Sequence, residues 1–344
     1  MDVIRWKAGA PAVAGLFAAI VPTCTDADER LSSVSPAWPA CRWHGGRSFD
    51  RLQDVMTPRF ERFAALAPEG FVTVAYLEWG AREAPGAVVC AHGLTRNARD
   101  FDVLAAALAA NGRRVVCVDM PGRGASDWLS RPEGYGYPLY VSVAAALLAR
   151  IDASEIDWVG TSMGGLIGMM LAAKTNTPIR RLLLNDIGPF IPKSALERLA
   201  GYVGADPRFD DLSGVEAYLR QVSAPFGPLS DAEWAHLARH SAIADGNGRL
   251  KLHYDPAIGG TFQARPIEDI DMWPVWEAIA CPTLIVRGAN SDLLLSTTLA
   301  EMKQRGPAAA NGLVQSVEFS RCGHAPALMA DDQVASVRRF IAGR

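Results

Sequence analysis

Short apolar runs alternate with amphipathic stretches over most of this chain. The segments with the composition of strands, most of them typical of strands covered on both faces, are residues 72–79, 87–91, 114–119, 156–159, 181–186, 283–287 and 314–319. Helical patterns separate them at residues 100–110, 139–151, 166–173, 296–305 and 332–342. This alternation predicts an α/β fold with a doubly wound, mostly parallel sheet, which places functional residues at the carboxyl ends of the strands.

The alternation of strands and helices is interrupted between residues 188 and 280. This interval is too long for a structureless loop, and it carries four helical patterns, at residues 192–202, 214–222, 230–240 and 274–279. We interpret it as a helical cap inserted into an α/β core formed by residues 56–187 and 281–344. Aromatic side chains run through the interval; most should pack between cap and sheet, and a few, with Trp273 as our candidate, should line an apolar pocket.

Residues 1–55 lack this regular pattern. Two basic residues precede a moderately apolar run at residues 8–21, as in a signal peptide, but the run contains proline and glycine and no clear cleavage site follows. Residues 25–50 have the composition of a linker. The segment is therefore a signal, a poorly ordered tail, or a product of start-codon choice ahead of Met56. We favour the tail, and expect a chain that begins at Met56 to fold and remain active.

Charge and cysteine content narrow the choice of partners. The formal net charge of −3 argues against a nucleic-acid partner and gives no reason to expect an anionic membrane surface. No apolar run reaches the roughly 18 residues of a membrane-spanning helix. The six cysteines have no metal-ligand spacing, which indicates a reducing compartment and no metal site. We expect a cytoplasmic protein, or an exported one if residues 1–24 act as a signal, and the sequence carries no indication of an oligomeric state.

The chemistry of the chain centres on residues 160–165, Gly-Thr-Ser-Met-Gly-Gly, between a predicted strand and a predicted helix. At a sharp strand-to-helix turn, Ser162 would be exposed, and glycines on both sides would let the strand and the helix approach closely. The free N–H groups at the start of the helix favour negative charge beside the serine. This context indicates a nucleophile more than it indicates a chance Gly/Ser turn.

A serine hydroxyl needs a base to remove its proton, and the base needs a third group to orient it. His324 follows the last predicted strand, which puts it at the same edge of the sheet as Ser162. Asp292 follows the strand after the cap, and Asp186 ends the strand before it. We choose Asp292, because the chain order serine, aspartate, histidine suits this architecture and because Asp186 is followed by the turn residues 187–189.

These residues together resemble the α/β-hydrolase superfamily, in its form with a serine nucleophile and a helical cap after the sixth strand. The resemblance covers about residues 71–344 and rests on motifs in the expected order: His92-Gly93, Asp119-x-Pro121-Gly122-x-Gly124-x-Ser126, Gly160-x-Ser162-x-Gly164-Gly165, Asp292 and Gly323-His324. The fold hosts esterases, lactonases, carbon–carbon hydrolases, perhydrolases and acyltransferases. Serine at position 162 disfavours the subfamilies with aspartate nucleophiles. Leu94, where carbon–carbon hydrolases often have a small residue, lowers that option.

The resemblance also implies an oxyanion hole made by the backbone N–H groups of Leu94 and Met163. The residues around Leu94 supply further candidates for contact with substrate. His92 is one, more through its backbone than through its ring. Arg96 either holds a polar group of the substrate or caps the next helix, and Asn97 is expected to cap.

We therefore expect a hydrolase that needs no cofactor and cleaves a small to medium carboxylic ester through an acyl-enzyme. Ser162 attacks the carbonyl, His324 transfers the proton and Asp292 orients the imidazole. The alternative is a carbon–carbon or lactone hydrolase with the same triad. A non-catalytic binding protein on the same fold is less favoured, since that class usually lacks a triad member.

Overall fold

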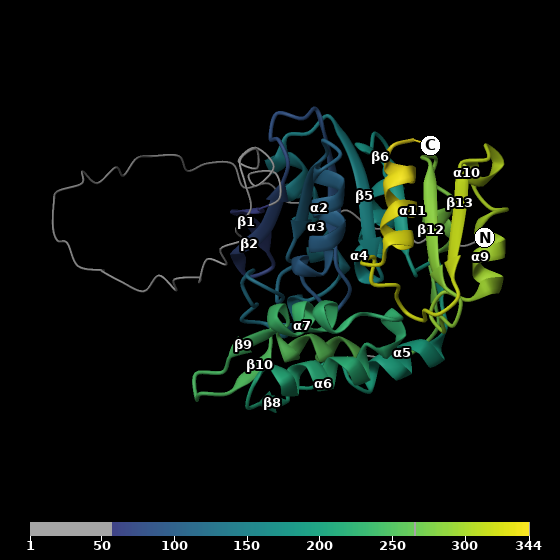
Figure 1. Cartoon of the computed structure of the whole chain (residues 1–344). Helices are drawn as coiled ribbons and strands as arrows, with labels where there is room; N and C mark the ends of the chain where they lie inside the picture. The colour runs from purple at the N-terminus through teal and green to yellow at the C-terminus, as the bar shows by residue number, and fades with distance from the viewer. Residues whose placement is uncertain (1–56, 265, 344) are drawn as a thin grey trace, which may run out of the picture. The chain divides into compact units, whose positions relative to one another are not determined.

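An eight-stranded sheet carries the core of the molecule (Figure 1). The computed structural model describes residues 57–264 and 266–343. In chain order, the strands of this sheet are β1 (Arg59–Ala67), β2 (Gly70–Trp79), β3 (Gly86–Ala91), β4 (Arg114–Val118), β5 (Glu155–Thr161), β6 (Ile179–Asn185), β12 (Thr283–Gly288) and β13 (Val314–Phe319). Their spatial order is β1-β2-β4-β3-β5-β6-β12-β13. All pairs from β4 to β13 are parallel, which confirms the predicted fold class.

Strand β1 is the one element of this sheet that the hydrophobic pattern did not predict. It pairs antiparallel with β2, and β2 in turn pairs antiparallel with β4. As an edge strand, β1 buries little: only Ala65 and Ala67 of its residues are buried. Its sequence therefore lacks the continuous apolar run that marks the inner strands.

Helices cover both faces of the sheet and enclose two separate apolar cores. The larger core receives α3 (Tyr137–Ile151), α4 (Met163–Ala172) and α9 (Ser296–Met302). The other core receives α2 (Asp102–Ala109) and α11 (Asp331–Ile341). The short helices η1 (Ala98–Phe101), η2 (Pro132–Gly134) and α10 (Pro307–Ala310) lie in the connections. Apolar cover on both faces explains why the inner strands read as continuous hydrophobic runs.

The segment 188–280, which we call the cap, gathers at one end of the sheet (Figure 1). Its helices α5 (Lys193–Ala200), α6 (Leu212–Val222), α7 (Asp231–His240) and α8 (Trp273–Trp276) confirm the four predicted helical patterns. Two 3-10 helices accompany them, η3 (Ala224–Phe226) and η4 (Pro256–Phe262). Helices α6 and α7 share a small core of their own, which includes Val215, Leu219, Trp234 and Leu237.

The cap also contains short strands, which the sequence did not predict. Strands β8 (Arg208–Phe209), β10 (Leu250–Leu252) and β9 (Ala242–Ala244) form a small antiparallel sheet. Strand β7 (Phe190–Ile191) pairs with β11 (Ile270–Asp271) near the two ends of the insertion. Strands of two or three residues are too short to carry a periodic pattern, so the sequence did not reveal them. The cap and core boundaries stay a prediction.

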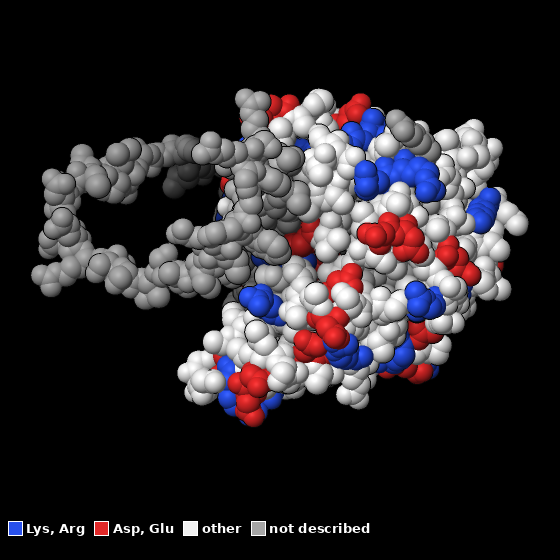
Figure 2. Space-filling view, in the orientation of Figure 1, with Lys and Arg blue, Asp and Glu red and all other residues white. Residues whose placement is uncertain are grey.

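Three further observations bear on the sequence-based expectations. Among the described residues, no helix combines the length and apolar character needed to cross a membrane. Cys90, Cys117, Cys281 and Cys322 are free thiols. Acidic and basic side chains are interspersed in small groups on the face shown in Figure 2. The expectation of a poorly ordered tail at residues 1–55 lies outside the described residues.

Candidate active site

Ser162 lies at the sharp turn between β5 and α4. Its backbone has φ 52° and ψ −114°, a conformation that L-residues rarely adopt and that is held here by surrounding hydrogen bonds. The Ser162 N–H donates to the Asn185 carbonyl at 3.0 Å, and the Gly164 N–H donates to the His92 carbonyl at 3.1 Å. The turn therefore presents the hydroxyl beyond the carboxyl end of β5, as the motif predicts.

Gly164 shows why this turn needs glycine. A Cβ at this position would lie 2.0 Å from the carbonyl oxygen of Ala91 in β3. Real atoms cannot approach so closely, so any side chain here would push α4 away from the sheet. The close packing of α4 on the sheet holds Ser162 in place.

His324 lies beside Ser162, although 162 residues separate them in the chain. The loop after β13 brings the imidazole to the carboxyl edge of the sheet, and Ser162 Oγ is 2.9 Å from His324 Nε2. On the other side of the ring, Nδ1 is 2.7 Å from Oδ2 of Asp186. In the tautomer that satisfies both contacts, Nδ1–H donates to Asp186 and Nε2 accepts from the Ser162 hydroxyl.

The carboxylate of Asp186 is itself held on three sides. Its Oδ1 accepts from the Gly288 N–H at 2.8 Å, and its Oδ2 accepts from the Ser291 hydroxyl at 2.5 Å as well as from His324. Asp186 is fully buried and adopts φ 56° at the end of β6. A buried carboxylate with this many donors is locked in one orientation, so it can fix the orientation of the imidazole.

The prediction that Asp292 orients the imidazole was wrong. Asp292 lies just beyond β12, where its carboxylate forms a bidentate ion pair with the Arg198 guanidinium of the cap. The two N–O distances are 2.5 and 2.8 Å. Burial alone would raise the pKa of Asp292, but the Arg198 guanidinium outweighs burial and holds the pKa below its usual value. Asp186 takes the position beside His324 because β6 lies directly beside β5, the strand that leads into Ser162.

The sequence missed Ser291, which donates to Asp186 from the loop after β12. It lies next to Asp292, so the same loop that suggested the wrong carboxylate supplies a hydroxyl that supports the right one. Asp186 was the competing candidate for this position. A signal for it was present, because it ends the strand that follows the Ser162 motif along the chain.

The loop after β3 presents the Leu94 N–H in a fixed direction. The Gly93 carbonyl accepts from His92 Nδ1 at 2.7 Å and from the Arg96 N–H at 3.1 Å. Across a trans peptide, the C=O and the N–H point in opposite directions, so pinning the Gly93 carbonyl directs the Leu94 N–H away from those donors. Neither the Leu94 N–H nor the Met163 N–H donates to a described residue. Both groups are free to bind a ligand atom.

His92, a candidate for substrate contact more through its backbone than through its ring, is fully buried. The ring has no exposed area, and its Nε2 accepts from the Met120 N–H at 3.0 Å. Burial, helped by the nearby arginines, lowers the pKa of His92 to about 3, so the ring is neutral at ordinary pH. Its function here is to pin the Gly93 carbonyl.

Asp119 and Ser126, from the second motif of the resemblance, also have structural contacts. The Asp119 carboxylate accepts from the N–H groups of Ala98 and Ala125 at 2.7 and 2.9 Å, which fixes the start of η1. Burial raises the pKa of Asp119 to about 6. The Ser126 hydroxyl donates to the Asp119 carbonyl at 2.6 Å. The motif therefore ties the loop after β4 to the segment that follows Leu94.

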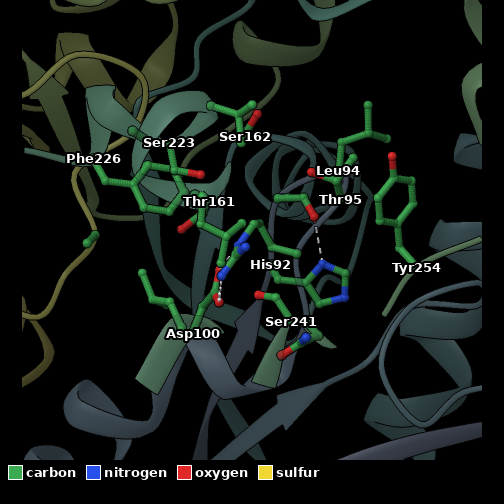
Figure 3. A pocket seen from close by; sticks show the side chains of 18 of the residues that line it. His92, Leu94, Thr95, Asp100, Thr161, Ser162, Ser223, Phe226, Ser241 and Tyr254 are labelled. Atoms are coloured by element: carbon green, nitrogen blue, oxygen red, sulfur yellow. Dashed lines mark hydrogen bonds and ion pairs between the residues drawn. The ribbon is translucent and has the colours of Figure 1, made fainter. Parts of the chain in front are cut away.

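Two cavities meet at Ser162. One, of about 100 Å³, is lined by His324 and by other residues of the core and the cap. Among these, Figure 3 labels Thr161, Ser223, Phe226, Ser241 and Tyr254. The other, of about 410 Å³, is lined mainly by apolar and aromatic side chains, among them Tyr137, Tyr140, Met163, Leu166, Ile191 and Phe262. Leu94 borders both. A ligand bound at Ser162 can therefore extend in two directions.

The remaining candidates for substrate contact have different outcomes. Arg96 lines the first cavity, where its guanidinium pairs with Asp100 at 2.8 and 2.6 Å. Asn97 caps η1 by accepting from the Arg99 N–H, as expected. The prediction for Trp273 was wrong: it lines a different depression, with the Arg305 guanidinium 3.8 Å from its ring centroid. Composition alone could not tell which aromatic side chains of the cap reach Ser162.

Comparison with known proteins agrees with this fold and site. A family model described as the alpha/beta hydrolase family matches residues 88–337. The chain belongs to this family, which confirms the resemblance inferred from its motifs.

The individual relatives define the enzyme class further. A 3-hydroxybutyrate-oligomer hydrolase of Cupriavidus necator is 44% identical over 83% of this chain and 99% of that protein. Esterase Rv0045c of Mycobacterium tuberculosis is 28% identical over 72% of this chain and 78% of that protein. A solved structure, described as a putative hydrolase from Rickettsia typhi, is 31% identical, with a TM-score of 0.76 over 84% of this chain and 99% of that one. The expected class, a hydrolase acting on esters, is confirmed.

Proposed function

We propose that this hydrolase cleaves the ester bonds of short 3-hydroxy-acid oligomers, with Ser162, His324 and Asp186 as its catalytic triad. The observation that carries the triad is the continuous chain of hydrogen bonds from the Ser162 hydroxyl through the imidazole to the Asp186 carboxylate. The substrate class is supported by the 44% identity to the Cupriavidus enzyme over nearly its whole length.

In the first half of the proposed reaction, His324 Nε2 takes the proton of the Ser162 hydroxyl as Oγ attacks the ester carbonyl carbon. The carbonyl π electrons move to oxygen, and a tetrahedral oxyanion forms. Asp186 stabilises the imidazolium through the hydrogen bond from Nδ1. When the intermediate collapses, the bond to the leaving alkoxide breaks, and Nε2–H protonates that alkoxide. An alcohol leaves, and the acyl group stays on Ser162.

In the second half, His324 Nε2 takes a proton from water as the water oxygen attacks the acyl carbon. The second tetrahedral intermediate breaks its bond to Ser162 Oγ, which recovers the proton from Nε2–H. A carboxylic acid leaves, and the free enzyme is restored. Side chains, backbone N–H groups and water supply every step.

The N–H groups of Leu94 and Met163 would stabilise both oxyanions. Each lacks a partner among the described residues, and the Leu94 N–H is aimed by the hydrogen bonds on the Gly93 carbonyl. Donors that are oriented in advance stabilise developing charge without reorganisation, and the loss of one typically costs about 10²–10³ in rate. The His92 ring would therefore contribute to the rate through the Leu94 N–H, whose direction it fixes.

The two cavities suit an ester with a group on either side of its scissile bond. With the carbonyl carbon at Ser162, the acyl and alcohol parts extend into the two cavities that meet there. The larger cavity, about 410 Å³, falls within the range of small-molecule sites, which supports a substrate of small to medium size.

A chain-length series of linear 3-hydroxybutyrate oligomers tests this function. We expect the purified protein to release the monomer acid from the dimer and trimer, measured by chromatography. Ser162→Ala should lose both this activity and labelling by a fluorophosphonate probe, while retaining its melting temperature, because a partly buried hydroxyl contributes little to packing.

The same assay separates the alternatives. Turnover of a lactone or of a vinylogous 1,5-diketone, with no cleavage of the oligomers, would favour a lactone or carbon–carbon hydrolase with the same triad. Failure of the wild-type protein to react with the probe would favour a binding protein on this fold.

A further inference from the structure

Three potential metal ligands meet where α7 of the cap contacts η1 and the first residue of α2 in the core. They are Asp102, the first residue of α2, and two histidines of α7, His236 and His240. One ligand atom from each lies within 4.8 Å of the others. The triad and the oxyanion loop use none of these residues.

The spacing of the two histidines places both rings on one face of the helix. Residues four apart in an α-helix lie one turn apart on the same side. The ring centroids of His236 and His240 are accordingly 4.6 Å apart. Two histidines at this spacing are a common pair of metal ligands.

Asp102 offers an oxygen with no partner. Its Oδ2 accepts from Arg99 Nε at 2.6 Å and lies 3.5 Å from His236 Nε2. Its Oδ1 is buried and accepts no hydrogen bond from a described residue. An unpartnered buried carboxylate oxygen loses the solvation that it has in water, and a cation would restore that stabilisation. The Arg99 ion pair can persist on Oδ2 while Oδ1 binds a metal.

Each ring has a nitrogen that forms no hydrogen bond with the described residues. His236 Nε2 lies 3.0 Å from the Arg99 carbonyl, so a proton on Nε2 leaves Nδ1 with a free lone pair. The His240 ring forms no hydrogen bond with the described residues. Metals bind imidazole through a ring nitrogen that carries no proton.

We propose that Asp102, His236 and His240 bind a divalent transition-metal ion, with Zn²⁺ as the best fit, and that the bound ion clamps the cap to the core. Two imidazole nitrogens and one carboxylate oxygen form a three-ligand set that Zn²⁺ accepts, with water in the fourth position. Bonds of roughly 2.0–2.1 Å place tetrahedral ligands about 3.3 Å apart, so these side chains need to close by only about 1–1.5 Å.

The proposed metal site lies next to residues that line the first cavity, but its three ligands do not line the cavity themselves. Leu237, between the two histidines, lines that cavity, and so does Asn97, whose Nδ2 donates to the His240 carbonyl at 2.8 Å. A metal that joins α7 to α2 therefore holds the cavity wall in place without touching Ser162. The site is independent of the proposed substrate.

Calorimetric titration of the metal-free protein with Zn²⁺ tests the proposal, with thermal melting as a second readout. We expect one strong site per chain and a rise in melting temperature of roughly 5 °C at a hundredfold excess over the Kd. His236→Gln/His240→Gln should lose that site and the rise. Asp102→Asn should weaken binding by about tenfold or more, since it replaces the charged ligand.

A control variant tests whether the metal binds at the proposed catalytic histidine instead. His324→Ala removes that imidazole and should keep the strong site and the melting shift. Loss of the strong site in His324→Ala, or its retention in the double glutamine variant, would overturn the proposal, as would the absence of binding to the wild-type protein. If the double variant fails to fold, His240→Gln serves instead, because its ring forms no hydrogen bond within the described chain.

Discussion

The carboxylate of Asp186 and the imidazole of His324 are joined by a hydrogen bond of 2.7 Å, although 138 residues separate them in the chain. The whole cap and two strands of the sheet lie between them in sequence. They meet because β6 lies next to β5, the strand that leads into Ser162, and because the loop after β13 reaches back over the carboxyl edge. This contact decides which aspartate supports the proposed chemistry.

Asp186→Asn should lower kcat by about 10⁴, because an asparagine beside Nδ1 favours the wrong imidazole tautomer. Asp292→Asn should lower kcat by no more than about fivefold, since its partly exposed ion pair with Arg198 contributes about 1 kcal/mol at most. Steady-state kinetics on a p-nitrophenyl ester compares the two. A larger loss in Asp292→Asn would return the catalytic role to the loop after β12.

Ser291→Ala should lower kcat by roughly tenfold with KM nearly unchanged, because it removes one hydrogen bond from a charged carboxylate, a loss of at least about 1.5 kcal/mol. Ser291 acts through Asp186 and is a positioning residue. Ser213→Ala is the control, since it removes a similar serine–aspartate hydrogen bond at the exposed start of α6. Equal kinetics for the two variants would show that Ser291 does not support the triad.

Gly164→Ala should lower the free energy of unfolding by about 3 kcal/mol or more, because the new methyl would meet the Ala91 carbonyl at 2.0 Å and the backbone cannot yield cheaply. Gly93→Ala is the matched control on the oxyanion loop. Its Cβ would lie 3.7 Å from Arg96 Cγ and 3.8 Å from Ser162 Cβ, which is ordinary contact. Denaturant unfolding should therefore show a change of only about 1 kcal/mol. Equal destabilisation by the two substitutions would contradict this account of the turn.

His92 should make stability depend on pH. Its pKa is about 3 in the folded protein, below the ordinary 6.5, so between these values the unfolded chain binds a proton that the folded chain does not. The contribution of His92 to the free energy of unfolding is therefore fully present above pH 6.5. It is lost as the pH falls towards 3, by roughly 1.4 kcal/mol per pH unit.

Replacing His92 with glutamine isolates this contribution. Between pH 6.5 and 5, His92→Gln should lose roughly 2 kcal/mol less stability than the wild type, measured by urea unfolding at each pH. The other buried histidines titrate in both proteins and cancel in the comparison. Identical pH slopes would show that the ring is charged, or exposed, in the folded protein.

The sequence by itself determined the features that depend on short stretches of chain. A strand that is buried on both faces requires a continuous apolar run, and such runs alternate with helical patterns along the chain. Strands and helices were therefore predictable near their observed positions. The serine turn was also predictable from a short stretch of chain. A strand that turns sharply into a helix brings the helix close to the sheet, and Gly164 allows this close approach. His324 was recognisable because it follows the last strand.

Only the tertiary structure decided between residues that sit at similar places in the chain. Asp186 and Asp292 both follow strands of the same sheet, and strand order together with loop direction sets which carboxylate reaches His324. Trp273 had the same composition signal as the aromatic residues near Ser162, but the path of the cap turns it elsewhere. The cluster of Asp102 with His236 and His240 joins segments far apart in sequence. Contacts between residues far apart in sequence depend on how helices and strands pack, so a local sequence pattern cannot predict them.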